Sequence, residues 1–394
     1  MRHDRVVTTT LDSDQHLFES RTLWQDHADP ADRDAAIAIV DDDTGNAWVT
    51  WHGTRISLAH VTHPGDPDDV GRQQARARDG VAPEVPYDEA LPRDYWDPDA
   101  RLATLDRLGF DGAILFPNYG LTWERTLEHD LRATTVNMGA WNRWAASVAH
   151  DGRGRLHPVA HLTLRDLDWL DRQLATLSAA GVRLAMIPPG LVDNRPLSHP
   201  DLDPAWSAFV EYGITPVFHI ASTCRPFPDA WYETEVDPDP NNLLLTSVFI
   251  WAAPALALAD LALNGVLARH PDLRVGVMEL SAVWVPMFMQ FMDGGYSFTS
   301  RLAGSEHTEL EMAPSEYVRR QVRFAAFSYE QPHRLAGAAG ELFMCCSDWP
   351  HSEGTEHALA EYGSLAHGSV TAEQHPGLFG GHAAWLLRND DPSH

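Results

Sequence analysis

The chain alternates between short apolar runs and helical patterns, and this alternation restricts its fold more than any other feature. Each run ends in a polar or Gly/Pro break. The predicted strands are Val6–Leu11, Gly112–Phe116, Leu156–His161, Val182–Ile187, Thr215–His219, Leu273–Met278, Val322–Phe327 and Leu342–Cys346. Predicted helices between them include Asp99–Leu108, Asp168–Ala180, Leu202–Tyr212 and Leu256–His270. Eight strands that alternate with helices can close into a parallel barrel covered by helices. We therefore predict an α/β fold, a distorted (β/α)8 TIM barrel with insertions.

A doubly wound sheet is the alternative fold. It would need a Gly-rich phosphate turn after the first strand, and the chain has Asp12–His16 there instead. A length of 394 residues suits one barrel domain with insertions, which we place at about 41–97 and 223–242. Within the first, the Pro/Asp-rich stretch Thr62–Asp97 has little periodicity and is expected to form a flap.

Composition excludes several classes of partner. The chain has 29 Lys+Arg against 56 Asp+Glu, all the basic residues are arginine, and the net charge is −27. Binding to nucleic acid or to an anionic membrane needs a basic face, so neither partner is expected. The three cysteines show no metal-binding spacing and no disulfide framework. No apolar stretch reaches the length of a membrane span, and a cytoplasmic protein is expected.

Polar side chains gather where the predicted strands end, which is where a barrel of this kind carries its active site. The strand ends carry Asp12, Asp14, His16, His219, Glu279 and the segment Ser347–His351. Side chains alternate along an extended chain, so Asp14 and His16 point to the same side and can reach one ion. Histidine and carboxylate ligands from separate strands suit a divalent cation with a position open to water. Any one of these residues alone could instead cap a turn or fill the core, so the prediction depends on the set.

Several strings of residues at or near these strand ends are distinctive. They are Asp12–Glu19, Phe218–His219, Arg269–Leu273 with Val277–Glu279, Ser347–Gly354, Trp141–Trp144 and Gly380–Ala384. Together they resemble the amidohydrolase-related family of the amidohydrolase superfamily, which comprises aminocarboxymuconate-semialdehyde decarboxylase-like metal-dependent hydrolases and decarboxylases. The resemblance covers nearly the whole chain apart from the two insertions. The string Ser347–Gly354 is the most specific of the set.

The resemblance implies a barrel with one divalent ion and a homodimer. It implies His16, His219 and Asp348 as ligands, with Asp348 also or instead moving protons. Many members have His-x-His after strand one, and here Asp14 takes the first place. Zn²⁺ is the expected ion. A carboxylate oxygen in place of a nitrogen makes the ligand set harder, which increases the preference of the site for Mn²⁺ or Fe²⁺ relative to Zn²⁺. Where many members have a histidine after strand six, this chain has Glu279, which could deprotonate a metal-bound water or ligate the metal.

Further residues near the predicted barrel mouth are candidates for contact with substrate or protons. His351 could orient Asp348 or transfer a proton. The candidates for substrate binding are Arg225, Asn118, His161, Trp284 and Trp349. Arg225 could hold a carboxylate with both guanidinium nitrogens. A solvated loop, a turn cap or simple packing is the alternative role for these residues. His382 stands where the family usually has Asn and is expected to be structural.

Three functions follow from this set of residues. The leading hypothesis is a metal-dependent hydrolase that cleaves a C–N or C–C bond in a small cyclic or aromatic carboxylated compound, with Glu279 or Asp348 taking a proton from water. The alternative is a non-oxidative decarboxylase of an aromatic or unsaturated carboxylic acid at the same site. A barrel that binds without turnover is the third, and the retained ligand set argues against it.

Overall fold

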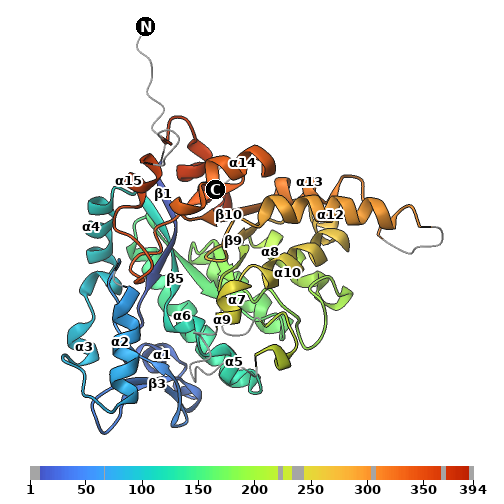
Figure 1. The fold of residues 1–394 in the computed structure, drawn as a ribbon. Coiled ribbons are helices and arrows are strands. Elements are labelled where there is room, and N and C mark those ends of the chain that lie inside the picture. Colours follow the sequence, from blue (N-terminus) through green and yellow to red (C-terminus); the bar gives the residue numbers. More distant parts are fainter. Residues whose placement is uncertain are drawn as a thin grey trace.

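The computed structural model describes residues 9–65, 67–220, 225–232, 244–302, 308–364 and 370–389. Its main sheet is a barrel of parallel strands (Figure 1). In order around the barrel these are β1 (Leu11–Leu17), β5 (Gly112–Pro117), β6 (Leu156–His161), β7 (Leu184–Met186), β8 (Thr215–Phe218), β9 (Val275–Val277), β10 (Val322–Ala326) and β11 (Phe343–Cys345). The barrel closes where β1 meets the segment after β11: the backbone N–H of His16 donates to the carbonyl of Trp349 at 2.8 Å. The predicted TIM barrel is confirmed.

Helices follow most strands and cover the outside of the barrel (Figure 1). They are α4 (Pro98–Leu108), α6 (Leu131–Asp151), α7 (Leu167–Ala179), α8 (Asp203–Glu211), α10 (Ala252–Leu263), α12 (Val285–Thr299), α13 (Pro314–Gln321) and α14 (Pro332–Ala339). Shorter helices are α1 (Leu23–His27), α5 (Glu124–Leu127), α9 (Leu244–Val248), α11 (Val266–Arg269), α15 (Ala358–Gly363) and α16 (His382–Leu386). Helix α4 illustrates how local sequence sets the helix ends. Asp97 caps its N-terminus by accepting from the Ala100 N–H, and Gly109 ends it with φ 85°.

The core has an inner and an outer layer, because successive strand residues point to opposite sides of the barrel wall. Ile114, Phe116, Val159 and Met344 belong to the inner cluster. Residues of α16 also belong to it and close the barrel at the end opposite the predicted site: the Thr215 hydroxyl at the start of β8 donates to the Leu386 carbonyl at 2.8 Å. The Nδ1–H of His382 donates to the Phe343 carbonyl at 2.8 Å, in keeping with the structural role predicted for it.

The first insertion contains more regular structure than its sequence suggested. Strands β2 (Ala38–Asp41), β3 (Ala47–Trp51) and β4 (Thr54–Leu58) form an antiparallel sheet. Helices α2 (Pro67–Arg78) and α3 (Tyr87–Ala90) follow, so the expected irregular flap over Thr62–Asp97 is wrong. The insertion packs beside the predicted site, since the Thr62 hydroxyl donates to the Pro350 carbonyl at 3.2 Å. Of the second insertion, 223–242, the structure describes only 225–232.

Two predicted elements need correction. The first strand is Leu11–Leu17 rather than Val6–Leu11, and the prediction at positions 6–8 lies outside the described residues. The predicted strand ends before Asp12, but the polar run Asp12–His16 continues it as a fully buried strand, in which Asp12 accepts from the side chains of Gln15 and Ser347. The predicted helix Leu256–His270 is two helices, α10 and α11, because Gly265 has φ 78° and breaks the helical path.

Within the described residues, the structure has no helix that is both long enough and apolar enough to span a membrane.

Candidate metal centre

Two histidines at the top of the barrel present the same ring nitrogen to one point. His16 lies in β1, and His219 directly follows β8. The Nδ1–H of His16 donates to the Pro117 carbonyl at 3.0 Å, and that of His219 donates to the Ile220 carbonyl at 3.1 Å. A carbonyl oxygen can only accept, so a neutral ring in this arrangement keeps its lone pair on Nε2. That is the form in which imidazole binds a metal ion.

Three carboxylates surround these two nitrogens. The Oδ1 atom of Asp14 lies 3.5 Å from Nε2 of both histidines. Asp348 Oδ1 lies 3.2 Å from His16 Nε2, and Glu279 Oε2 lies 3.1 Å from His219 Nε2. Two overlapping groups each place all their donor atoms within 4.8 Å of one another: Asp14, His16, His219 and Glu279, and His16, Glu279, Asp348 and His351. The structure therefore brings together all the residues that the sequence suggested as metal ligands or proton carriers.

The backbone is strained where two of these carboxylates leave their strands. Glu279 follows β9 with φ 50°, and Asp348 follows β11 with φ 55°. A residue other than glycine in this left-handed region costs on the order of 1–3 kcal/mol, and such residues concentrate at functional sites. The loop after Asp348 returns very close to it, because a Cβ on Gly354 would lie 2.4 Å from the Asp348 carbonyl oxygen. Only glycine fits there, which accounts for the end of the Ser347–Gly354 string.

His351 connects Asp348 to a polar residue at the end of β5, the strand beyond β1. Its Nδ1 lies 2.9 Å from Asp348 Oδ1, and its Nε2 lies 3.0 Å from the side-chain oxygen of Asn118. Its ring stacks on that of His16, with centroids 3.7 Å apart and an interplanar angle of 25°. The predicted candidates His351 and Asn118 are thus joined to the cluster as a chain of polar contacts that leads away from Asp348.

The cluster holds excess negative charge in a buried place. Burial raises the pKa of Glu279 well above its usual range, and the charge of Asp348 adds to this shift. Burial also raises the pKa of Asp14, but the positive charges of His219 and His16 outweigh this effect and hold the pKa below its usual value. Burial opposes the protonation of His16, yet Asp14 and Asp348 raise its pKa well above the usual value. A positive charge is therefore strongly favoured between these side chains.

Many of the buried polar atoms in the cluster make no hydrogen bond within the described part of the chain. They are both carboxylate oxygens of Asp14 and of Asp348, Glu279 Oε2, His351 Nδ1, and Nε2 of His16 and of His219. Buried polar atoms are nearly always paired, so a set of orphans that converge on one point indicates a ligand. Oxygen and imidazole donors at the C-terminal ends of several barrel strands fit one divalent ion.

The family follows from the sequence as a whole. A family model described as amidohydrolase matches residues 12–388. The chain belongs to the amidohydrolase family. The match begins at β1 and ends in the segment after α16, so it includes every residue of the candidate metal centre. No curated protein matches the chain.

Solved structures of the same fold include other members of this superfamily. An amidohydrolase from Mycobacterium avium subsp. paratuberculosis superposes with a TM-score of 0.73 at 20% identity, covering 97% of this chain and 100% of its own. The 5-carboxyvanillate decarboxylase of Sphingomonas paucimobilis gives a TM-score of 0.63 at 15% identity, with 97% and 99% covered. A dihydroxybenzoic acid decarboxylase from Polaromonas, solved with manganese and 2-nitroresorcinol, gives 0.61 at 13%, with 98% and 99% covered. At these identities the likeness shows the fold.

A buried network lies beneath the amidohydrolase metal centre and joins β1 to the segment after β11. Asp12 accepts from the Ser347 hydroxyl at 2.6 Å and from the Gln15 side chain at 2.8 Å. Arg101, a fully buried cation on α4, donates to the Gln15 side chain at 3.3 Å and to the His16 carbonyl at 2.7 Å. Its guanidinium also lies 4.3 Å from the ring centroid of Trp349. These hydrogen bonds therefore hold the residues next to Asp14 and Asp348, and the backbone of His16, in fixed positions.

The remaining substrate-binding candidates lie outside the cluster. His161 is buried, and its Nε2 lies 3.0 Å from Glu124 Oε2, while Trp123 packs on its ring. Trp284 is in the core, where its N–H donates to the carbonyls of Leu280 and Ser281. Trp349 is buried over Arg101. All the contacts described for these residues are packing and hydrogen bonds within the protein. A substrate role for them stays a prediction.

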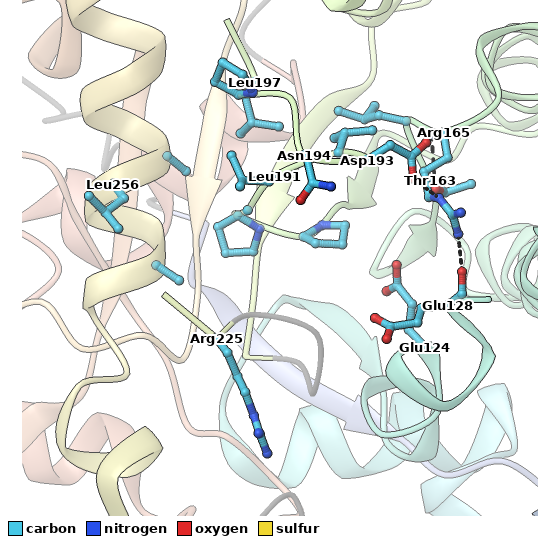
Figure 2. A pocket seen from close by; sticks show the side chains of 18 of the residues that line it. Glu124, Glu128, Thr163, Arg165, Leu191, Asp193, Asn194, Leu197, Arg225 and Leu256 are labelled. Carbon is cyan, nitrogen blue, oxygen red and sulfur yellow. Dashed lines mark hydrogen bonds and ion pairs between the residues drawn. The ribbon is translucent and has the colours of Figure 1, made fainter. Parts of the chain in front are cut away.

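Arg225 lines a large cavity beside the metal centre (Figure 2). The cavity measures about 830 Å³ and lies between the segments that follow β6, β7 and β8 and helix α10. Figure 2 shows Leu191 and Leu256 on its walls and Arg165 bonded to Asp193 and to the Glu128 carbonyl. A second cavity of about 20 Å³, large enough for about one water, is lined by His219 and shares Pro189, Pro226 and Ala253 with the large one.

The sequence prediction missed several residues that support the site. Alternation along β1 could have placed Gln15 opposite Asp14 and His16. Nothing in the helical pattern of α4 distinguishes Arg101 from a surface arginine. Glu124 also carries no sequence signal. Glu19 closes the distinctive string Asp12–Glu19, but the sequence assigned it no role; it is buried and accepts the backbone N–H groups of Tyr119 and Gly120 at 2.9 and 2.8 Å.

Proposed function

We propose that this amidohydrolase is a metal-dependent, non-oxidative decarboxylase of an aromatic carboxylic acid of the benzoate type. The observation that carries the proposal is the buried cluster of Asp14, His16, His219 and Asp348, with the carboxyl group of Glu279 at its open side. Support also comes from the solved decarboxylases of the same fold, which act on 5-carboxyvanillate and dihydroxybenzoates. The proposal replaces hydrolysis, our first expectation from sequence, with its alternative.

The proposed ligands are Asp14, His16, His219 and Asp348. When bound, the divalent ion would stabilise negative charge on the carboxylate and the neighbouring oxygen of the substrate. Three carboxylates near two imidazoles make a hard donor set, which favours Mn²⁺ over the Zn²⁺ expected first. Two of the solved decarboxylases of this fold hold manganese.

Decarboxylation needs a proton rather than an activated water. The bond between the ring carbon and the carboxylate breaks, CO₂ leaves, and the electron pair that stays on the carbon takes up a proton. Glu279 has the position for this step, because it is the carboxyl group of the cluster that keeps some exposure, at 12%, whereas Asp14 and Asp348 have none. A proton from solvent would then return to Glu279. His351 and Asn118 hold Asp348 in place, and Arg225 is proposed to bind a substrate carboxylate.

The test uses the Mn²⁺-loaded protein, a panel of hydroxybenzoates and labelled solvent. We expect release of CO₂ and, in D₂O, deuterium on the ring carbon that lost the carboxylate. In H₂¹⁸O no label should enter the organic product. Glu279→Gln should keep its metal and lose about 10²–10⁴ in kcat, the usual size of a lost proton-transfer group. Glu316→Gln, a change of an exposed carboxylate that accepts the Ala313 N–H on α13, is the matched control.

Hydrolysis is the second candidate, and Glu279 is again the reason, since a carboxylate beside a bound ion can take a proton from water. It requires ¹⁸O from water in the organic product. That result, together with no deuterium on a ring carbon, would reject decarboxylation.

A further inference from the structure

The large cavity beside the metal centre has more room than a single aromatic ring needs. At about 830 Å³ it lies in the upper part of the range of about 300–1,000 Å³ that is usual for pockets that enclose drug-sized ligands. Its walls come from the segments after β6, β7 and β8 and from helices α5 and α10 (Figure 2). The proposed benzoate-type acid has one ring, which must lie at the metal centre to react. The cavity can therefore hold a further part of a larger substrate.

The cavity begins next to a metal ligand. His219 lines the small cavity together with Leu280, the residue that follows Glu279. One of the three wall residues that the small and the large cavity share is Pro226, which directly follows Arg225. A substrate whose reacting ring lies beside His219 would therefore extend past this shared wall into the large cavity.

One wall of the large cavity is apolar and exposed. Leu191, in the segment after β7, is 67% exposed, and Leu256 on α10 is 59% exposed. Figure 2 shows both side chains on the side of the cavity away from Glu124 and Arg165. Large apolar side chains that face a cavity favour contact with an apolar ligand. This wall is therefore suited to a hydrocarbon ring.

The opposite wall is polar, and its groups are bonded within the protein. Arg165 donates to Asp193 at 2.8 Å and to the Glu128 carbonyl at 2.6 Å. Glu124 Oε2 lies 3.0 Å from Nε2 of the buried His161, and the Glu124 side chain keeps 11% exposure where it lines the cavity. A carboxylate accepts hydrogen bonds and repels a second carboxylate. This end of the cavity therefore suits a neutral hydroxyl group.

We propose that the substrate is an aromatic acid with a second, apolar ring that bears a hydroxyl group. Its reacting ring lies at the metal centre, its second ring packs against Leu191 and Leu256, and its hydroxyl donates to Glu124. His161 is then a positioning residue, which acts on the substrate through Glu124. This inference rests on the proposed function, because it extends the substrate of the same site.

Binding of compact and extended acids to the Mn²⁺-loaded protein tests the inference without the need for turnover. The compact acid is a dihydroxybenzoate, and the extended acids carry a hydroxybenzyl group at each free position of its ring. By isothermal titration calorimetry we expect one extended acid to bind about 10-fold or more tightly than the compact acid, the least that an extra apolar group in a matching pocket provides. Binding of every extended acid that is no tighter than that of the compact acid would overturn the inference.

Gly190 offers a way to fill the cavity. It lines the cavity, and a Cβ at this position would meet nothing within 4 Å, so Gly190→Phe adds a ring where we place the second ring of the substrate. We expect the ratio of the two dissociation constants, compact over extended, to fall about 10-fold. Leu256→Asp, which needs no new space, should lower this ratio as well. A wild-type ratio in both variants would overturn the inference.

Two further measurements complete the test. Gly337→Phe on α14, where a Cβ also meets nothing within 4 Å, is the matched control and should keep the wild-type ratio. Release of CO₂ from the same samples separates this inference from the proposed function. An extended acid that binds through the cavity without loss of CO₂ would reject the proposed function, whereas CO₂ from the compact acid alone would reject the extended substrate.

Discussion

The two sides of the metal centre are held in different ways. On the side where β1 meets β11, Asp14, His16 and Asp348 are fully buried, and their neighbours are tied to the network of Arg101 and Asp12. On the side of β8 and β9, Phe116 packs on the His219 ring with centroids 4.1 Å apart, and Glu279 keeps some exposure. We infer that the two sides have different roles. The β1/β11 side holds its ligands rigidly for the ion, and the β8/β9 side provides Glu279, the group proposed to exchange protons with solvent.

The largest effect should come from removal of one ligand on each side. We expect His219→Ala and Asp348→Ala each to reduce the metal content from about one ion per chain to a trace, because a site that lacks one donor among buried charges loses most of its affinity. Elemental mass spectrometry of the purified variants measures this directly. Glu316→Gln should retain the ion. If His219→Ala kept its metal while Asp348→Ala lost it, the ion would belong to the β1/β11 side alone.

A smaller effect should follow from weakening the network beneath β1. Arg101→Met keeps an unbranched side chain of similar volume beside Trp349 but removes the guanidinium and with it the donors to Gln15 and His16. We expect metal affinity to fall by about 10–100-fold, the usual cost of losing a group that orients ligands. Titration of the metal-free protein with Mn²⁺, followed by its electron paramagnetic resonance, measures both the affinity and the symmetry of the site.

Two controls separate positioning from general stability. Arg320→Met removes a comparable arginine on α13, which donates to the Leu267 carbonyl and lies over Tyr317, and it should leave the affinity unchanged. Gln15→Met interrupts the same network but keeps the positive charge of Arg101. It should therefore reproduce part of the effect of Arg101→Met. An Arg101→Met protein that binds Mn²⁺ as the wild type does would show that the two sides are not built differently.

The sequence predicted the barrel and the members of the metal cluster because both depend on short-range patterns. Strand–helix alternation gives the barrel, and its C-terminal ends then bring Asp14, His219 and Glu279 to one mouth. The sequence placed the end of the first strand too early. The run Asp12–His16 lacks the apolar character of a buried strand, and the partner that stabilises Asp12, the hydroxyl of Ser347, lies far along the chain. Arg101 lies 85 residues from His16, whose carbonyl it binds, and no local pattern encodes such a contact.

The side-chain contacts of two predicted substrate residues could not be derived from the sequence either. Trp284 and His161 stand near strand ends, so the barrel rule placed them at the mouth. Their side chains pack into the protein, Trp284 among core aromatics and His161 against Glu124, and a substrate role for them stays a prediction. Position along a strand is therefore predictable from sequence, but the direction in which a side chain turns after the strand ends is set by packing.

The last prediction concerns stability rather than metal binding, and a carboxyl group just beyond the metal centre on the β1/β11 side. Burial raises the pKa of Glu19 from 4.5 to about 7, although it accepts the N–H groups of Tyr119 and Gly120. The folded state therefore holds this proton more tightly than the unfolded state, so the free energy of unfolding should fall as the pH rises from about 4.5 to about 7, by up to about 3 kcal/mol. Glu19→Gln, which stays neutral, should lose this part of the pH dependence. Urea unfolding at several pH values measures it, with the surface variant Glu316→Gln as the control. A pH dependence in Glu19→Gln equal to that of the wild type would mean that Glu19 stays ionised in the folded protein, and that the backbone donors outweigh its burial.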